Sequence, residues 1–356
     1  MNDLTHNAAA GGGGTEVEVD LLIVGAGPVG LFGAYYAGVR GLRTALVDSL
    51  DQVGGQVSAM YPEKQIHDIA GFPAVSGRDL ITNLVEQAAA HDPRYLLGHE
   101  ARQLRRIPRE GRPDLLEIRT GAGAVVRAGA VVVTGGIGPF TPRPLPAGEA
   151  HLGRGLAYFV PSAAPYAGED VVVVGGGDSA VDWALMLQPV ARSVTLVHRR
   201  DAFRAHAASV AALRTSGVRI VTRAQVTATL GKDRLEQVKL RTTGADTPEL
   251  LPCGRLVAAL GFTADLGPLR EWGLELHDNR HLVVDSAMRT GVPGVFAAGD
   301  IADYDGKVRL IAVGFGEVAT AVNNAAVHLD PDAQLFPGHS TDQQDEPAVP
   351  VLVRSA

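Results

Sequence analysis

The chain has 356 residues, enough for two domains with separate hydrophobic cores, and its 46% hydrophobic content with 43 glycines is typical of a soluble α/β protein. The net charge of −7 argues against nucleic acid as the main partner, because binding phosphates requires a basic face. The single cysteine, Cys253, excludes an intramolecular disulfide, a CxxC redox pair and a cysteine-rich metal site, and we expect no metal.

The N-terminal region has the features of a flexible tail followed by a buried strand. Residues 1–17 contain a GGGG run and have neither a basic start nor an apolar core, so we expect no signal peptide. Residues 21–39 are apolar and long enough for a membrane span, but glycines and a proline interrupt them. A strand, turn and helix fit these residues better, and we expect a cytoplasmic protein without a membrane segment.

The first chemical motif is a glycine-rich turn in LLIVGAGPVGLFGA, between a predicted strand and a predicted helix. Gly25 permits the tight turn, Gly27 lets the backbone approach a pyrophosphate, and Gly30 lets the helix pack on the strand. Pro28 lies in the same turn, where free amides of the helix can hold negative charge. Asp48 follows 23 residues after Gly25, where a carboxylate binds ribose hydroxyls and repels a 2′-phosphate. This site is predicted to bind FAD or NAD.

A second turn in VVVVGGGDSAVDW repeats the same order of strand, turn and helix. Its small residues are Gly175, Gly177 and Ala180, and the helix begins around Asp178 and Ser179. The repeat predicts a second dinucleotide site at the start of this helix.

The residues after the next strand distinguish the two sites. Counting 23 residues from Gly175 leads to His198, which Arg199 and Arg200 follow, with Arg204 further on. Guanidinium groups suit phosphate oxygens, so this site is predicted to bind the 2′-phosphate of NADP(H). Since the two loops select different cofactors, the chain is predicted to pass reducing equivalents between FAD and NADP(H).

Four strings, GAGPVG, GGGDSA, HRRDAFR and GVFAAGDI, together resemble the two-dinucleotide-domain flavoprotein reductases, including thioredoxin reductase. The resemblance runs from about residue 18 to about 330 and implies that Asp300 binds the ribityl chain of FAD. The stretch RGLAYFVPSAAPYAGED lacks the cysteine pair of thioredoxin reductases. Without that dithiol, electrons cannot reach a disulfide partner by thiol exchange, so thioredoxin reduction is excluded.

The chain is similar in further places to the cysteine-free branch of this family, the thioredoxin-reductase-like ferredoxin/flavodoxin–NADP⁺ reductases. The segment GGQVSAMYPEKQIHDIAGFP implies that Gln56 contacts the flavin or ribityl chain and that Tyr61 stacks on one flavin face. GGIGPFTPR implies Phe140 near the flavin, and Arg102 aligns with an adenine-contacting strand end.

The resemblance also gives a role to the chain beyond the predicted helix at 317–329. In the branch, such an extension lays an aromatic or histidine ring over the other flavin face, often in the partner subunit of a homodimer. The matching residue here is His339, followed by Ser340 and Thr341.

We expect an α/β fold of two Rossmann-like domains of the three-layer ββα type, with the NADP(H) domain inserted into a discontinuous FAD domain. Proline-containing crossovers at the boundaries are predicted hinges for domain rotation. The predicted units are a tail at 1–17, FAD-binding parts at 18–139 and 267–330, an NADP(H)-binding domain at 140–266, and an extension at 331–356.

The implied reaction is reversible hydride transfer from NADPH to FAD, followed by single-electron transfer to ferredoxin or flavodoxin. No side chain needs to form a covalent intermediate. Two alternatives keep both loops: an NADPH oxidase or quinone reductase with a small acceptor, and a non-catalytic NADP(H)-sensing flavoprotein. A run of arginines is predicted to be either a solvated segment or a docking patch for an acidic carrier. Its members are Arg102, Arg105, Arg106 and Arg109.

Overall fold

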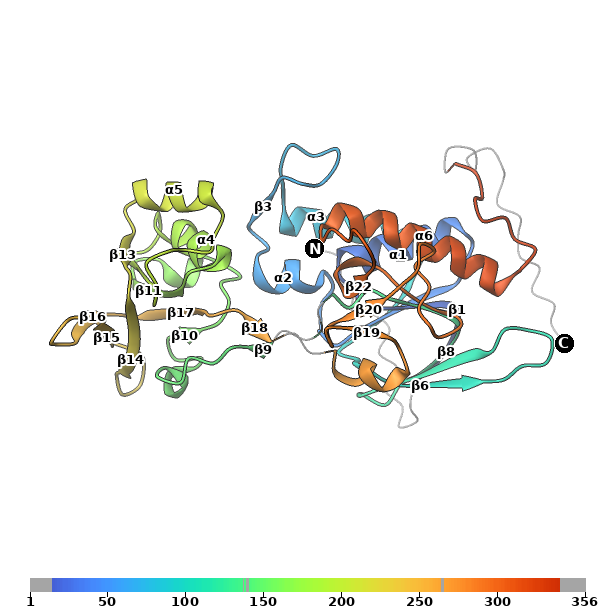
Figure 1. Ribbon diagram of the computed structural model, residues 1–356, viewed down its shortest axis with the longest axis horizontal. Helices are drawn as coiled ribbons and strands as arrows, with labels where there is room; N and C mark the ends of the chain where they lie inside the picture. Colours follow the sequence, from blue (N-terminus) through green and yellow to red (C-terminus); the bar gives the residue numbers. More distant parts are fainter. Residues whose placement is uncertain (1–14, 137, 139–140, 264–265, 340–356) are drawn as a thin grey trace.

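The computed structural model describes residues 15–136, 138, 141–263 and 266–339. They form two lobes joined by narrow connections (Figure 1). The larger lobe contains a mixed sheet and the smaller lobe a parallel one. The predicted α/β fold class is therefore confirmed.

The larger lobe is built on a seven-stranded sheet. Its strands are β1 (Glu16–Val24), β2 (Thr44–Asp48), β5 (Arg94–Leu97), β6 (Ala101–Ile107), β7 (Leu115–Thr120), β8 (Val125–Val133) and β21 (Val295–Ala297). The order is β5-β2-β1-β8-β7-β6, with β21 also paired to β8. Strands β5, β2, β1, β8 and β21 are parallel, which agrees with the apolar runs LLIV in β1 and AVVV in β8. Strands β6 to β8 form an antiparallel meander.

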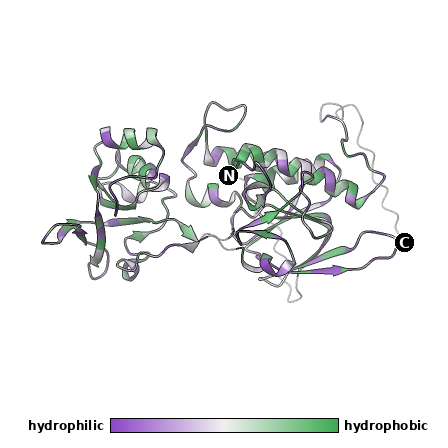
Figure 2. Cartoon of the chain, viewed as in Figure 1, coloured by the Kyte–Doolittle hydropathy of each residue, from purple (hydrophilic) through white to green (hydrophobic). Residues whose placement is uncertain are grey.

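Helices cover one face of this sheet, with α1 packed against both α3 and α6 (Figure 1). The helices of the lobe are α1 (Pro28–Val39), α2 (Gly55–Met60), α3 (Gly77–Ala89) and α6 (Ile311–Leu329). Helix α3 shows hydrophilic and hydrophobic bands in Figure 2, since Leu80, Leu84 and Ala88 recur on its buried face. Shorter elements of the lobe are β3 (Gln65–Ile66), β4 (Val75–Ser76), η3 (Gly267–Trp272), β19 (Leu276–His277), β20 (His281–Val283), η4 (Gly299–Ile301) and β22 (Ala302–Asp303).

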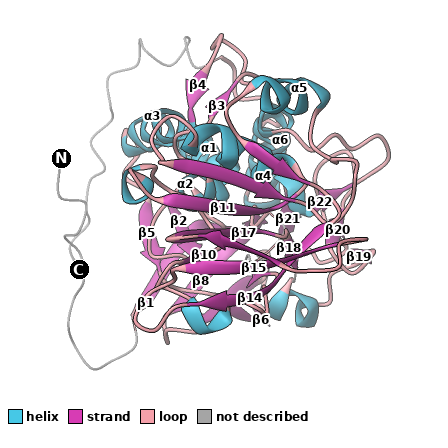
Figure 3. Ribbon diagram, turned by 90° about the vertical axis from the view of Figure 1, so that its left-hand side faces the viewer, coloured by secondary structure: helices cyan, strands magenta, loops and turns pink. Residues whose placement is uncertain are grey.

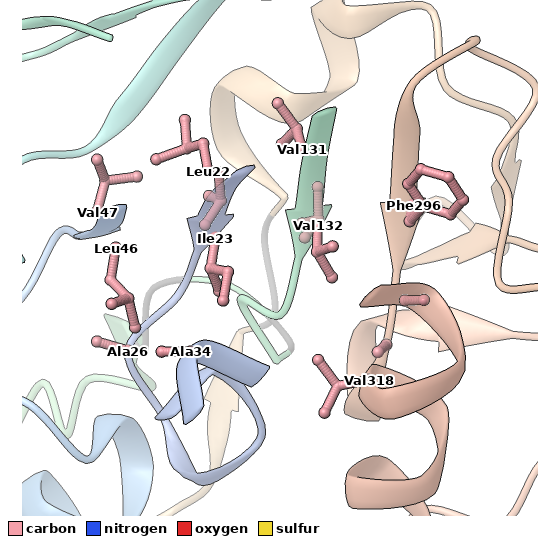
Figure 4. Close-up of a cluster of buried hydrophobic side chains, with 14 of the residues drawn as sticks. Leu22, Ile23, Ala26, Ala34, Leu46, Val47, Val131, Val132, Phe296 and Val318 are labelled. Carbon is pink, nitrogen blue, oxygen red and sulfur yellow. The ribbon is translucent and has the colours of Figure 1, made fainter. Parts of the chain in front are cut away.

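The core of the larger lobe lies between the sheet and these helices (Figure 4). Ile23 and Leu46 are fully buried on neighbouring strands, and Val132 continues the layer on β8. Val318 of α6 faces this layer from the helical side. Burial of each such side chain contributes about 1.5–3 kcal/mol, so this layer stabilises the packing of α6 against the sheet.

The smaller lobe has three layers, most easily seen in Figure 3: helices, a parallel sheet and an antiparallel sheet. The helices are α4 (Asp178–Leu187) and α5 (Ala207–Thr215). The parallel sheet contains, in order, β10 (Leu156–Ala157), β17 (Arg255–Ala259), β11 (Asp170–Gly175), β12 (Ser193–Val197) and β13 (Arg219–Val221). The antiparallel sheet contains β14 (Ala224–Leu230), β15 (Gln237–Thr242) and β16 (Glu249–Pro252). The lobe also contains the short turns η1 (Glu149–His151) and η2 (Ala164–Tyr166).

The two connections between the lobes run side by side. Strand β9 (Thr141–Pro142) pairs with β18 (Phe262–Thr263) in antiparallel fashion. The rings of Phe159 and Phe262 stack at 5.3 Å where the connection enters the smaller lobe. Each of these two paired strands is only two residues long.

Helix α6 differs from the sequence-based expectation, because it begins at Ile311 and not near residue 317. The additional turns contain Gly314 and Gly316, which disfavour a helix in an isolated peptide. Tertiary packing stabilises them here, since a side chain at Gly314 would collide with Val29 of α1. In the part of the chain that the structure describes, no helix is both long and apolar enough to cross a membrane.

The contact between Gly30 and the first turn can be tested by adding a methyl group. At Gly30 it would stand 1.9 Å from the backbone oxygen of Gly25, whereas at Gly316 it would meet nothing within 4 Å. We expect Gly30→Ala to destabilise the protein by about 1–3 kcal/mol, because backbone atoms would have to move. The matched control Gly316→Ala should be neutral or stabilising by up to about 1 kcal/mol. Equal thermal unfolding midpoints for the two variants would contradict this packing.

Candidate functional site

The first glycine turn lies between β1 and α1 and is tightly packed on one side. Gly25 has a φ of +115° and lies against the backbone of Thr134, whose Oγ1 donates a hydrogen bond of 2.8 Å to the Gly25 oxygen. Gly27 is different, because a side chain there would meet nothing within 4 Å. Gly27 is also the N-cap of α1, and no side chain caps this helix end. The amides at the start of α1 therefore face open space, as an anion site requires.

The carboxylate of Asp48, at the end of β2, hydrogen-bonds the backbone of this turn. Its Oδ2 accepts the amide of Ala26 at 2.6 Å and its Oδ1 accepts the amide of Leu50 at 2.9 Å. Burial raises the pKa of the Asp48 carboxyl, and these backbone hydrogen bonds act in the opposite direction. A carboxylate can accept more than these two hydrogen bonds, so it remains suited to ribose hydroxyls.

The residues implied to hold the flavin ring come from three separate elements. The Nε2 atom of Gln56, on α2, lies close to Gly136: a Cβ atom added at that glycine would be 3.1 Å from it. Tyr61 ends α2 and is near enough to Asp300 for that carboxylate to raise its pKa, although burial is the larger cause. Burial also raises the pKa of Asp300 in η4, and Lys307 opposes that effect. Tyr61 thus lies within electrostatic range of Asp300.

These observations fit a bound flavin dinucleotide in the larger lobe. The open start of α1 lies next to the Asp48 carboxylate, which hydrogen-bonds the same turn. Asp300 lies in η4, and the residue before it, Gly299, contacts Val29 in the first turn of α1. The site therefore combines an anion-binding helix end with carboxylates suited to sugar and ribityl hydroxyls.

Some implied residues are not brought to this site. His339 is exposed and its ring lies edge-on to Phe336, in a segment anchored to the C-terminal end of α1 by a 2.9 Å hydrogen bond from Arg40 to the Gln334 oxygen. In Figure 1 this segment lies at the opposite end of α6 from helix α2, which Tyr61 follows. Phe140, Ser340 and Thr341 lie outside the described residues.

The arginines considered for adenine contact or docking lie on strand β6 and the turn after it. Arg102 binds Glu100 at 2.9 Å, and Arg106 binds Asp114 at 2.8 Å. Figure 1 shows β6 on the side of the larger lobe away from α2. Arg105 is exposed on the same strand, and Arg109 donates to the backbone oxygen of Pro113. Local acids thus neutralise part of this run.

The second glycine turn, between β11 and α4, repeats the geometry of the first. A side chain at Gly175 would collide with the Ala259 oxygen at 2.4 Å, whereas one at Gly177 would meet nothing within 4 Å. Ala180 is fully buried against the strand, and Ser179 lines the cleft toward the larger lobe. Asp178 accepts the amide of His206 at 2.8 Å, which ties the start of α4 to that of α5.

His198 is buried against the backbone of the second turn and does not lie on the exposed side where a ligand would bind. It is 7% exposed, its ring packs against Gly176, and it stacks with Phe203 at 5.3 Å. Burial lowers its pKa, and the positive charges of Arg199, Arg200 and Arg204 lower it further. The neutral ring therefore holds the turn in place, while the arginines surround it.

Arg199, Arg200 and Arg204 are all exposed beside the second turn. The Arg204 amide donates to the Gly176 oxygen at 2.7 Å, which fixes its position next to the glycines. Within the described ranges, no ion pair to these guanidinium groups is found, unlike Arg192, which binds Asp170. A group of cations without acidic partners is suited to a bound phosphate.

The two lobes face each other across a cleft that the sequence did not predict. Lys64 of the larger lobe binds Asp182 of α4 at 2.7 Å, linking the lobes directly. A cavity of about 140 Å³ next to this pair is lined by Tyr61, Trp183 and Met186. The candidate flavin-stacking tyrosine thus faces the helix that begins at the second glycine turn.

Cys253 belongs to the smaller lobe and is 1% exposed. Burial raises the pKa of its thiol to about 12. At neutral pH the thiolate is therefore essentially absent, and the chain's only sulfhydryl is suited to packing and not to exchange.

A family model for pyridine nucleotide-disulphide oxidoreductases matches residues 19–325 of the chain. The chain belongs to this family. A protein of Nocardioides sp. named ferredoxin–NADP reductase is 61% identical over 326 residues, covering 92% of this chain and 98% of the relative. A ferredoxin–NADP reductase of Salinispora arenicola is 62% identical over 325 residues, covering 91% and 99%. The crystal structure of T. acidophilum thioredoxin reductase is 26% identical, with a TM-score of 0.73 over 89% of this chain and 99% of that one.

These similarities confirm the resemblance seen in the sequence motifs. Family membership and the names of the relatives imply the use of a flavin and of NADP. Sequence reasoning missed Lys64, Asp182, Lys307 and Glu317, each of which makes a defined contact near the site. Of these, only Glu317 carried a signal, as the one acid in the apolar stretch IAVGFGEVATAV.

The ion pair across the cleft can be tested by charge reversal. We expect Lys64→Glu to widen the distribution of distances between the lobes, and Lys64→Glu with Asp182→Lys to restore it. The pair is partly exposed, so the change in population should be no more than about fivefold. Spin labels at Glu86→Cys and Thr215→Cys would report the distance between the lobes. Cys253 should not take up label, because it is buried. Identical distributions in all three proteins would show that the pair does not hold the lobes together.

Proposed function

We propose that this chain is a ferredoxin–NADP reductase in which FAD mediates electron transfer between NADPH and ferredoxin. The observation that carries the proposal is 61% identity, over 92% of the chain, to a protein named ferredoxin–NADP reductase. The two glycine turns support it, since one is paired with Asp48 and the other with Arg199 and Arg200. Such a pair suits two different dinucleotides in one chain.

FAD, when bound, supplies the hydride acceptor and the single-electron donor, because this chemistry belongs to the cofactor. The residues of the chain bind and orient it. The amides at the start of α1 would hold the pyrophosphate and Asp48 the adenosine ribose. Asp300 and Gln56 would hold the ribityl end, and Tyr61 would cover one ring face and exclude water from it.

The second turn would hold NADPH in the same manner, with the amides of α4 on its pyrophosphate. Arg199 and Arg200 would bind the 2′-phosphate, and Arg204 would add a third positive charge. The nicotinamide must then approach the flavin across the cleft between the lobes. The narrow β9–β18 connection would permit that approach by rotation of one lobe.

A thiol pathway does not fit this chain, although thioredoxin reductase structures resemble it. The sequence contains one cysteine, and Cys253 is buried with its pKa raised to about 12. Transfer by dithiol exchange requires two sulfhydryls near the flavin. The electrons would therefore leave directly to a one-electron carrier.

We propose further that the segment after α6 acts in a homodimer. Helix α6 has 19 residues and so spans about 28 Å, which separates its C-terminal end from Asp300. His339 follows the exposed Leu335 and Phe336, which are 54% and 57% exposed and suited to burial against a second copy. The partner copy would then place His339 over the flavin. Sedimentation of the flavin-loaded protein as a single chain would contradict this arrangement.

The proposed activity predicts carrier-dependent turnover. We expect NADPH-dependent reduction of cytochrome c to be strongly stimulated by substoichiometric ferredoxin, since cytochrome c then accepts electrons from the recycled carrier. Flavodoxin at the same concentration tests the other carrier. Fast turnover with quinones or oxygen and no carrier effect would support a small-acceptor oxidase instead. Flavin reduction without turnover on any acceptor would support a sensor.

The arginines of the second site predict the coenzyme preference. We expect Arg199→Ala with Arg200→Ala to raise KM for NADPH at least about tenfold, because charge-assisted hydrogen bonds to the 2′-phosphate are lost. KM for NADH, which lacks that phosphate, should change little. Arg192→Gln is the matched control, since Arg192 is already paired with Asp170. An unchanged NADPH-to-NADH ratio of kcat/KM in the double variant would exclude this site.

A further inference from the structure

A buried ion pair lies beneath the turn that carries Asp300. The side chains of Lys307 and Glu317 are 3% and 5% exposed, and the Lys307 ammonium donates to Glu317 Oε1. Glu317 is on the second turn of α6, whereas Lys307 is in the loop before that helix. Neither residue is among the proposed flavin or NADPH contacts.

The described contacts of the Glu317 carboxylate are with Gly299 in η4 and with two residues of the loop after β22, Tyr304 and Lys307. Its Oε2 accepts the backbone amide of Gly299 at 2.8 Å. Its Oε1 accepts the Tyr304 hydroxyl at 2.7 Å, and this hydrogen bond is the largest cause of the rise in the Tyr304 pKa to about 12. The Lys307 ammonium also lies over the Tyr304 ring, 5.4 Å from its centre. The group thus fixes the residue immediately before Asp300 and the loop after it.

Gly299 lies in a narrow space between the first turn of α1 and helix α6. Its φ is +80°, and a side chain there would stand 3.2 Å from Val29 in the first turn of α1. Gly314 of α6 approaches from the other side, with its Cβ position 3.3 Å from the Gly299 Cα. A backbone amide in so narrow a space needs a defined acceptor, and Glu317 supplies it.

A buried charged pair is an expensive way to supply that acceptor, since desolvation of both ions offsets much of their attraction. Stability alone would be served as well by apolar side chains of similar size. The particular feature of Glu317 is that it bonds the amide next to a candidate flavin ligand. Burial is the main cause that raises the pKa of Asp300; the Lys307 charge lowers this pKa, whereas the Glu317 charge raises it.

We propose that Glu317 is a positioning residue for flavin binding, which aims Asp300 by holding the Gly299 amide, and that Lys307 holds the Glu317 carboxylate in place. This inference rests on the flavin role of Asp300 put forward in the proposed function.

The first experiment isolates the hydrogen bond to Gly299. Lys307→Met with Glu317→Gln removes both charges but keeps an acceptor, whereas Lys307→Met with Glu317→Leu removes the acceptor as well. Neither variant leaves an unpaired buried charge, so both should fold. We expect the glutamine variant to bind FAD at least about tenfold more tightly than the leucine variant, measured by quenching of FAD fluorescence. Equal affinities would overturn the proposal.

The second experiment asks whether Glu317 acts through Asp300. In a protein that carries Asp300→Ala, the same glutamine and leucine variants should bind FAD with affinities within about twofold of each other, because no ligand is left to aim. A difference as large as that seen with Asp300 present would show that Glu317 acts on overall stability, and would overturn the proposal. A purely structural role predicts this second result, so the two readings differ.

A surface pair serves as the control for removal of charge. Arg219 binds Glu249 at 2.8 Å on the smaller lobe, and Arg219→Met with Glu249→Gln should leave FAD affinity unchanged. Failure of wild-type protein to bind FAD would overturn both this inference and the proposed function. If FAD binds but ferredoxin does not stimulate turnover, only the proposed function fails, and the comparison with Asp300→Ala still decides the inference.

Discussion

The first turn of α1 is held between two other segments of the larger lobe, and the glycines at these contacts leave no room for side chains. Gly30 packs on the Gly25 oxygen, and Gly299 and Gly314 both pack on Val29. Gly33 extends the contact along the helix, because a side chain there would collide with Val318 of α6. The position of the open helix end, of η4 and of the start of α6 all depend on this close approach.

The charged residues near the two sites differ in whether other groups of the protein already bind them. Asp48 accepts two backbone amides, and Glu317 is surrounded by an ammonium, a hydroxyl and an amide. These groups are fixed before any ligand arrives, so little reorganisation is needed on binding. Arg199 and Arg200 are exposed beside the second turn and lack a described acidic partner, which suits groups whose partner is a ligand.

Much of the candidate site could be predicted because its signals are local. The glycine spacing, the helix after it and the acid at Asp48 all fall within one βαβ unit, so short-range geometry determines them. Helix α6 was predicted too short, since Gly314 and Gly316 weaken helix propensity and only contact with α1 stabilises that turn. The ion pair of Lys64 and Asp182 joins residues 118 positions apart, and no sequence pattern relates them.

The sequence by itself determined that there are two dinucleotide turns, that one carries an acid and the other arginines, and that a dithiol is absent. Each of these properties depends on residue type and short spacing. The tertiary structure alone decided that Tyr61 lies within electrostatic range of Asp300, that the His198 ring packs against Gly176, and that Glu317 holds the Gly299 amide. Such contacts arise where segments distant in sequence pack together, because burial and hydrogen-bond direction are properties of the assembled core.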